Sequence, residues 1–189
     1  MKKVISSNKK SDLLVFVVQK HASTRLHYDF RLQIGDVMPS WAIPKGPTLD
    51  PTVKRLAMQT PDHELEYRHF EGKIAEGEYG AGAVMIWDEG TYFAEVEVEK
   101  GKREMVKNNV EAQTVMQDGL IKGELKFQLL GRKLKGSFAL VKTRGFGPNN
   151  AWLLIKHKDE YVKEGYDAND FDFSAKSKRT MDEISQIVM

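Results

Sequence analysis

The sequence predicts a mainly β protein, folded as a compact antiparallel β-barrel of about eight strands with a few short helices. Short runs rich in β-branched and aromatic residues, separated by glycine and proline, dominate the chain up to about residue 158. Stretches with a helical period of apolar residues are few. Many short strands with few helices between them are typical of closed or nearly closed barrels.

The individual strands follow from alternation and from turn residues. Arg25–Gln33 alternates apolar and polar side chains with a period of two, as a half-buried strand does. Gly35-Asp36 supplies a turn after it, and Gly131-Arg132 lies between two alternating runs, which predicts a hairpin. The strands expected, in chain order, are Leu13–Gln19, Arg25–Gln33, Pro39–Ile43, Arg55–Gln59, Ala83–Trp87, Thr91–Val98, Gly123–Leu129, Lys133–Lys142 and Ala151–Lys156.

The rest of the chain is predicted to be loop, a little helix and a tail. Proline and glycine between Pro44 and Pro51 predict an irregular loop, and Met105–Met116 is the one mid-chain stretch with helical character. We expect a leader over residues 1–12, one barrel domain over 13–162 and a polar tail over 163–189. The tail is expected to be loosely held at first. It should end in a short helix, docked or frayed, because Thr180-Met181-Asp182-Glu183 forms a capping box.

The composition excludes several classes of protein. With 29 basic and 27 acidic residues, the formal net charge of +2 is too small for a general coat on nucleic acid. A polyanion would therefore meet a local cluster of cations. No apolar run approaches the roughly 20 residues that span a bilayer, and the run from Leu13 to Val18 is too short for a signal peptide. The absence of cysteine excludes disulfides and thiolate metal sites, and it fits a cytoplasmic protein.

One strand carries the residues that point most clearly to chemistry. Its alternation places His27, Asp29 and Arg31 on the face opposite an apolar one. Residues two apart on a strand lie roughly 6.6 Å apart at the backbone, so two such side chains can hold one metal ion. His21, at the end of the preceding strand, is a candidate third ligand. Two imidazoles and a carboxylate suit Mn²⁺, Fe²⁺, Co²⁺ or Zn²⁺.

A plainer interpretation is that His27 and Asp29 form only a hydrogen-bonded pair at the surface. Arg31 beside them favours the metal site, because a guanidinium next to a metal ion grips phosphate with two hydrogen bonds. The resulting hypothesis is a metal ion and a cation that act on one phosphate.

Further candidates lie downstream. Lys45 lies in a loop stiffened by prolines, which would hold a cation in place, although a solvated lysine in an ordinary turn fits this segment, taken alone, better. Arg55 opens a strand and could equally be a surface residue. His63 is a candidate metal ligand, general acid or phosphate donor, with a capping or packing histidine as the alternative. The glycine-rich stretch Phe70–Gly82 predicts tight turns, and it lacks the Lys-Ser/Thr ending of a nucleotide-binding loop.

Eleven short motifs occur in order over roughly residues 13–160 and can be compared with a known family. They are Gln19–His21, His27–Leu32, Ser40–Pro47, Asp50–Pro51, Lys54–Ala57, Asp62–His63, Phe70–Gly72, Gly77–Gly82, Trp87–Thr91, Leu134–Val141 and Trp152–Lys156. Taken together, they resemble the 3′-phosphoesterase domain of bacterial DNA ligase D and its free-standing archaeal and bacterial relatives. Several motifs in register are far more specific than any one of them. The chain therefore resembles a free-standing member of that family.

The resemblance implies a compact β-barrel whose concave pocket holds one Mn²⁺ ion, with other divalent transition metals as alternatives. His21, His27 and Asp29 match the family's metal ligands. The residues implied around the scissile phosphate are Arg31, Lys45, Arg55 and His63, with Tyr67 lining the same pocket.

The activity implied by the resemblance is 3′ end healing in DNA repair. The family removes a 3′-terminal ribonucleotide from a primer strand, leaving a 3′-phosphate, and then hydrolyses that phosphate to a 3′-hydroxyl. The implied partners are DNA primer–template 3′ ends, including ends with a terminal ribonucleotide, and a separate DNA ligase and polymerase. No membrane is involved.

The chain departs from the family in three places. Ala75 stands where proline is usual, Pro61 stands where an acidic residue is expected two before His63, and the longer leader of ligase-fused members has no counterpart. These departures bear on ribonucleotide removal more than on the phosphatase step. Residues 92–120 match poorly and have no assigned role.

Two other classes of function remain open. One is a non-catalytic DNA-end-binding module that recruits a ligase or polymerase; it would bind strands without converting them. The other is a non-haem iron oxygenase, which also uses two histidines and a carboxylate on a β-barrel. Dependence of the activity on oxygen would separate that oxygenase from a phosphoesterase.

Overall fold

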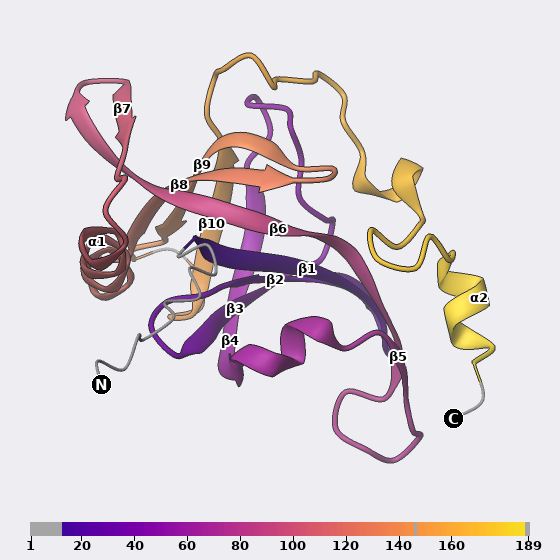
Figure 1. Cartoon of the computed structure of the whole chain (residues 1–189). Coiled ribbons are helices and arrows are strands. Elements are labelled where there is room, and N and C mark those ends of the chain that lie inside the picture. The colour runs from indigo at the N-terminus through magenta and orange to yellow at the C-terminus, as the bar shows by residue number, and fades with distance from the viewer. Residues whose placement is uncertain (1–12, 146, 188–189) are drawn as a thin grey trace, which may run out of the picture.

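A computed structural model describes residues 13–145 and 147–187, and within them eight antiparallel strands close into a barrel (Figure 1). The predicted fold class is therefore confirmed. Around the barrel the strand order is β1-β2-β3-β4-β10-β9-β8-β6, and β6 pairs with β1 to close the ring. The barrel strands are β1 (Leu14–Ala22), β2 (Leu26–Leu32), β3 (Val37–Ile43), β4 (Arg55–Glu64), β6 (Gly82–Glu99), β8 (Glu124–Gly131), β9 (Lys135–Lys142) and β10 (Ala151–Lys156).

Aromatic side chains fill the inside of the barrel. Phe30 stacks on Phe127, and Phe127 stacks on Phe138, with ring centroids 5.8 Å and 6.3 Å apart. Trp41 and Trp152 meet edge to face, and both are completely enclosed. Because each large aromatic side chain buries about 150–250 Å², this interior contributes strongly to the stability of the barrel.

The strand β6 corrects two predictions at once. The sequence analysis expected separate strands at Ala83–Trp87 and Thr91–Val98, but the structure has one strand of 18 residues through both. Between the two predicted strands lie Asp88 and Gly90, residue types common in turns, and here both make contacts that the closed barrel requires. The carboxylate of Asp88 accepts hydrogen bonds from three consecutive backbone N–H groups after β8, and Gly90 lies opposite Gly131, where a side chain would overlap backbone.

The connections at the barrel ends agree in part with expectation. The irregular loop over 44–51 and the hairpin at Gly131-Arg132 are both confirmed. Two short strands, β5 (Gly72–Ile74) and β7 (Lys102–Met105), pair with opposite ends of β6 and were not predicted. A 3-10 helix, η1 (Leu65–His69), follows β4 and was not predicted either.

The mid-chain helix lies further along the chain than predicted. It is α1 (Asn109–Lys122), whereas the sequence analysis expected Met105–Met116. Met105 ends β7, and the Asn108 side chain accepts a hydrogen bond from the backbone N–H of Glu111, so the helix begins after that cap. The helix ends at Gly123, which has the left-handed conformation that favours glycine.

The tail packs against the barrel, so the expectation that it is loosely held at first is wrong. Tyr166, Ala168 and Ile184 are buried, and the tail contains a 3-10 helix, η2 (Ala168–Phe171). The expected terminal helix is α2 (Met181–Ser185), with both hydrogen bonds of its capping box present. It lies beside the β5 end of β6, away from α1 (Figure 1).

Two further expectations concern the N-terminal leader and membrane-spanning segments. The predicted leader, residues 1–12, lies outside the described residues. Within residues 13–145 and 147–187, no helix is both long and apolar enough to cross a bilayer.

Candidate metal centre

The candidate residues gather on the outer face of the β1–β2 hairpin. In the register of this antiparallel pair, His21 lies opposite His27 and Gln19 lies opposite Asp29. Phe30 and the other apolar residues of β2 point into the barrel. Because side chains alternate along a strand, Asp29 and Arg31 point outward. The site is thus built on the outside of the barrel wall.

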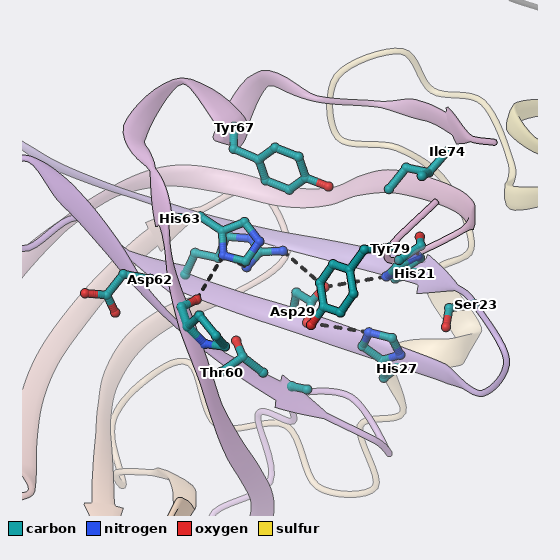
Figure 2. Close-up of a pocket in the computed structure, with 14 residues that line it drawn as sticks. His21, Ser23, His27, Asp29, Thr60, Asp62, His63, Tyr67, Ile74 and Tyr79 are labelled. Atoms are coloured by element: carbon teal, nitrogen blue, oxygen red, sulfur yellow. Dashed lines mark hydrogen bonds and ion pairs between the residues drawn. The ribbon is translucent and has the colours of Figure 1, made fainter. Parts of the chain in front are cut away.

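Segments from other parts of the chain turn this outer face into a pocket of about 520 Å³ (Figure 2). The end of β4 and η1 form one wall, and the turn between β5 and β6 forms another. Leu65 of η1 rests on a small cluster of Val17, Met38 and Ile86 on the same outer face, which seats that wall. The lining residues are His21, Ser23, His27, Asp29, Arg31, Ala42, Thr60, Pro61, Asp62, His63, Tyr67, Ile74, Tyr79 and Gly80.

Three of these residues meet as a metal-binding group would. His21, His27 and Asp29 each offer a ligand atom, and these atoms all lie within 4.8 Å of one another. The His21 Nδ1 atom is 3.7 Å from one Asp29 carboxylate oxygen, and the His27 Nε2 atom is 3.5 Å from the other. Within the described part of the chain, this is the one such group of histidine and acidic side chains.

The backbone fixes which nitrogen of each histidine is free to bind a cation. The Nε2 atom of His21 lies 2.8 Å from the carbonyl oxygen of Gly80, and the Nδ1 atom of His27 lies 2.8 Å from that of Arg25. A carbonyl oxygen only accepts, so these two nitrogens donate. In the neutral form of each ring, the other nitrogen therefore carries the lone pair and faces Asp29, and such outer hydrogen bonds are typical of metal-ligating histidines. The donor set thus fits a divalent transition metal.

The charges around Asp29 agree with a cation site. Burial would raise the pKa of Asp29, but hydrogen bonds with His21 and His27 and the charge of Arg31 outweigh burial and hold that pKa well below its usual value. In turn, a hydrogen bond that protonated His27 would donate to Asp29 raises the pKa of His27, against the effect of burial, and a bound cation would take the place of that proton. The carboxylate is therefore ionised, and it attracts positive charge to the point where the ligand atoms meet.

Arg31 lies beside the carboxylate, almost completely buried. Its Nη2 atom donates to Asp29 over 3.1 Å, its Nε atom donates to Gln19 over 2.7 Å, and its Nη1 atom lies 3.0 Å from His63 Nδ1. The ring of Tyr67 covers the guanidinium at 5.2 Å. Arg31 is thus held in one place by four neighbours, and two of its five N–H groups remain for a further acceptor.

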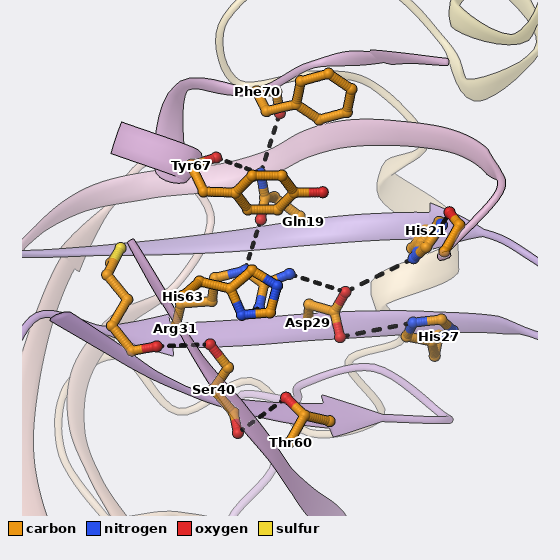
Figure 3. Close-up of polar contacts among 12 residues, drawn as sticks. Gln19, His21, His27, Asp29, Arg31, Ser40, Thr60, His63, Tyr67 and Phe70 are labelled. Atoms are coloured by element: carbon orange, nitrogen blue, oxygen red, sulfur yellow. Dashed lines mark hydrogen bonds and ion pairs between the residues drawn. The ribbon is translucent and has the colours of Figure 1, made fainter. Parts of the chain in front are cut away.

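Gln19 connects the floor of the site to its wall, and the sequence analysis missed it. Its side-chain amide is completely buried, accepts from Arg31 and donates to the carbonyl oxygens of Tyr67 and Phe70, each over 3.0 Å (Figure 3). The available signal was its spacing: it lies two residues before His21, on the same face of the same strand.

His63 and Tyr67 share the wall opposite the hairpin. Their ring centroids are 4.9 Å apart. Burial and the nearby Arg31 charge lower the pKa of His63, so the ring is neutral near pH 7. Its Nδ1 atom touches both Arg31 and the Pro61 carbonyl oxygen, at 3.0 Å and 3.1 Å. One nitrogen cannot accept from the first and donate to the second, so the two contacts are alternatives. The other ring nitrogen, Nε2, makes no hydrogen bond with residues 13–145 or 147–187.

Two candidates lie apart from this pocket. Lys45 is exposed, and neither it nor Arg55 is among the residues that line the pocket. Among the described residues, the Nε atom of Arg55 is buried without a hydrogen-bond partner. Hydrogen bonds from Thr52 and Gly165 lower the pKa of Asp50, on the loop before β4, and the charge of Arg55 adds to this effect. The structure therefore brings together six of the eight predicted site residues, and a role for Lys45 and Arg55 at the phosphate stays a prediction.

Comparison with known proteins identifies the family. The family model described as the DNA ligase D 3′-phosphoesterase domain matches residues 19–142, more than half of the chain. The chain belongs to this family. All six pocket residues that were predicted lie inside the matched range.

Curated relatives of this phosphoesterase-domain family are much longer proteins. The chain is 45% identical, over 150 residues, to the multifunctional non-homologous end joining protein LigD of Pseudomonas aeruginosa. It is 41% identical, over 152 residues, to the multifunctional non-homologous end joining DNA repair protein LigD of Mycobacterium tuberculosis. These matches cover 78% and 79% of the chain but only 15% and 17% of the two relatives. The similarity therefore concerns one domain of those proteins.

Proposed function

We propose that this phosphoesterase-family domain is a metal-dependent 3′ end-healing enzyme that acts on nucleic acid primer strands in DNA repair. One observation carries the proposal: a ring nitrogen from each of two histidines, oriented by a backbone carbonyl on the other side of the ring, faces the ionised Asp29, with the Arg31 guanidinium at its side. A divalent cation and a guanidinium side by side suit a phosphate better than a neutral organic substrate.

The proposed metal ion is Mn²⁺, held by His21, His27 and Asp29. When bound, such an ion polarises a phosphate oxygen and offsets the charge that develops on it during hydrolysis. The protein's own contribution is position. Arg31 keeps two N–H groups for phosphate oxygens, and its other contacts are made before any substrate arrives, so little reorganisation is needed.

His63 is the proposed donor to the phosphate or to the leaving oxygen. Its ring is neutral, and when Nδ1 accepts from Arg31 the proton is on Nε2, which has no partner among the described residues. Tyr67 packs on both His63 and Arg31, so we propose that it holds these two groups in place.

We propose two reactions, hydrolysis of a 3′-phosphate and removal of a 3′-terminal ribonucleotide. The first uses the metal ligands together with Arg31 and His63. The second is expected to be the weaker, because the wall position two before His63 is Pro61 and carries no carboxylate. Asp62, the next residue, lines the same pocket and supplies a carboxylate on that wall, one residue away from the position of Pro61.

The partners and the setting are proposed from the relatives' names. Those relatives are called multifunctional end-joining proteins, and this chain matches only one part of them. We therefore propose that it acts in the cytoplasm on DNA ends, together with a ligase and a polymerase.

The direct test uses two labelled primer–templates, one ending in a 3′-phosphate and one in a single 3′-ribonucleotide. Purified protein with Mn²⁺ should convert both to 3′-hydroxyl ends, and a chelator should stop the conversion. Asp29→Asn should remove activity, whereas Lys102→Gln on the distant strand β7 should leave it intact.

Other outcomes would redirect the proposal. Conversion of the phosphate alone would restrict the function to the phosphatase step. Strand binding without conversion, with or without metal, would support an end-binding module instead. An activity that requires oxygen would support an oxygenase.

A further inference from the structure

The turn that forms one wall of the pocket carries an unusually exposed aromatic side chain. Tyr79 is 95% exposed, the largest value among the exposed large hydrophobic residues of the described chain, and it lines the same pocket as the metal-binding group (Figure 2). A single exposed apolar residue elsewhere on a surface needs no explanation. At the mouth of a phosphate-binding pocket, such a ring has a specific use.

The turn holds Tyr79 in a defined position relative to the site. The backbone N–H of Ala81 donates to the carbonyl oxygen of Glu78 over 3.1 Å, which makes Tyr79 the second residue of a four-residue turn. The third residue, Gly80, has a φ of +78°, as in a type II turn. The carbonyl oxygen of Gly80 also accepts the hydrogen bond from His21, so the turn is tied directly to a metal ligand.

The faces of the Tyr79 ring are free, in contrast to those of the other tyrosine in the pocket. Tyr67 stacks on Phe70 at 5.4 Å and covers Arg31 at 5.2 Å, which occupies its ring. No ring stacking, cation contact or hydrogen bond of the Tyr79 side chain occurs among the described residues. Its neighbours Glu76 and Glu78 are exposed and acidic, so this turn would repel a phosphate backbone. The uncharged ring is the part of the turn that a nucleic acid can approach.

We propose that Tyr79 is a stacking platform for the terminal nucleobase of the strand whose 3′ end occupies the pocket. This inference rests on the proposed function and narrows its substrate class to strands that carry a terminal base. Aromatic rings recognise bases of any sequence in this way, because every base has a flat π face. The phosphate would be held by charge and the base by stacking, so an abasic end or a small phosphomonoester should bind more weakly.

The test measures stacking without relying on turnover. A strand ending in a 3′-hydroxyl, with the fluorescent base 2-aminopurine at its terminal position, is titrated with protein, and the quenching of its fluorescence reports the stack. Tyr79→Ala should remove the quenching and weaken binding roughly 5- to 150-fold, the effect of losing one base–aromatic stack. Tyr79→Phe should keep both. Ile121→Ala, which removes another highly exposed side chain, on α1, should change neither.

Two controls address the position of the contact and its chemistry. Moving 2-aminopurine three nucleotides inward should abolish the quenching, because only the terminal base reaches the turn. Loss of binding in Tyr79→Phe would overturn the stacking role and assign the contact to the hydroxyl group. Equal binding and quenching by wild type and Tyr79→Ala would overturn the inference completely.

The outcomes also separate this inference from the proposed function. If the wild type quenches terminal 2-aminopurine and Tyr79→Ala does not, but Mn²⁺ supports no conversion of 3′-phosphate ends, the stacking role stands and the catalytic proposal fails. If conversion is normal in both proteins and no quenching occurs, the catalytic proposal stands and the stacking role fails. If the wild type neither binds nor converts the strand, both fail.

Discussion

The Gln19→Leu substitution tests whether one buried amide holds the floor and the wall of the site together. Leucine has a similar volume, so the change removes hydrogen bonds without leaving a large cavity. Gln19 makes two bonds to backbone carbonyls, worth about 1 kcal/mol each, and accepts one from a guanidinium, worth about 2 kcal/mol. The partners would be left unsatisfied in a buried setting, so we expect a loss of about 4 kcal/mol of unfolding free energy.

Two measurements follow from this estimate. Urea denaturation reports the unfolding free energy, and thermal denaturation should show a midpoint lower by roughly 8–16 °C for a domain of this size. Activity on a 3′-phosphate end, at a temperature where the variant is folded, should fall roughly 10- to 100-fold, because Arg31 and the η1 wall lose their common anchor.

Gln128→Leu is the matched control. Gln128 lies on β8, is only partly buried, and makes no side-chain hydrogen bond within the described residues. It should cost less than about 1 kcal/mol. If Gln19→Leu costs no more than Gln128→Leu and keeps full activity, the view that Gln19 connects the two parts of the site is wrong.

Three further predictions concern metal binding, packing and pH. Adding Mn²⁺ at about 100 times its dissociation constant should stabilise the wild type by about 2.7 kcal/mol, and Asp29→Asn should lose that gain in calorimetry; an equal gain in both would place the ion elsewhere. Gly46→Ala should destabilise the fold by about 2–4 kcal/mol in urea denaturation, because φ at Gly46 is +74° and an added Cβ would lie 2.8 Å from the Cβ of Ala168. Gly145→Ala is the control: φ is +68° but, apart from its chain neighbours, no atom of the described residues lies within 4 Å of the added Cβ, so it should cost only about 1–2 kcal/mol. Burial lowers the pKa of Lys133 to about 8 from 10.5, so between these pH values the unfolded chain keeps a proton that the folded chain has lost, and stability should rise with pH. Unfolding free energies at pH 7.5 and 10 should show this rise in the wild type relative to Lys133→Gln, and a constant difference between the two proteins would refute it.

Local patterns in the sequence predicted what depends on neighbouring residues. The alternation in β2 correctly separated the barrel face from the site face, and the capping box correctly located α2, because each depends on side chains within a few positions. The signals for the ends of α1, a capping Asn108 and a terminal Gly123, were also present in the sequence, so the prediction of Met105–Met116 missed them.

Contacts between distant segments were beyond local patterns. Aspartate is common in turns, yet the Asp88 carboxylate accepts hydrogen bonds from the backbone N–H groups of residues 132–134. These contacts form only when the barrel closes. In the site, the carbonyl oxygens of Gly80 and Arg25 decide the histidine tautomers, and a backbone oxygen leaves no mark in the sequence. The position of Lys45 outside the pocket likewise depends on the path of a loop rather than on its residue types.

The location of the three candidate ligands on one hairpin has a consequence for folding kinetics. His21, His27 and Asp29 are close in sequence, so the group can assemble as soon as β1 and β2 pair, before the ring closes between β1 and β6. Local contacts of this kind form early, whereas barrel closure joins distant segments and is slow. A bound ion would then stabilise the transition state as well as the native state. Refolding rates, and not only unfolding rates, should therefore respond to the metal.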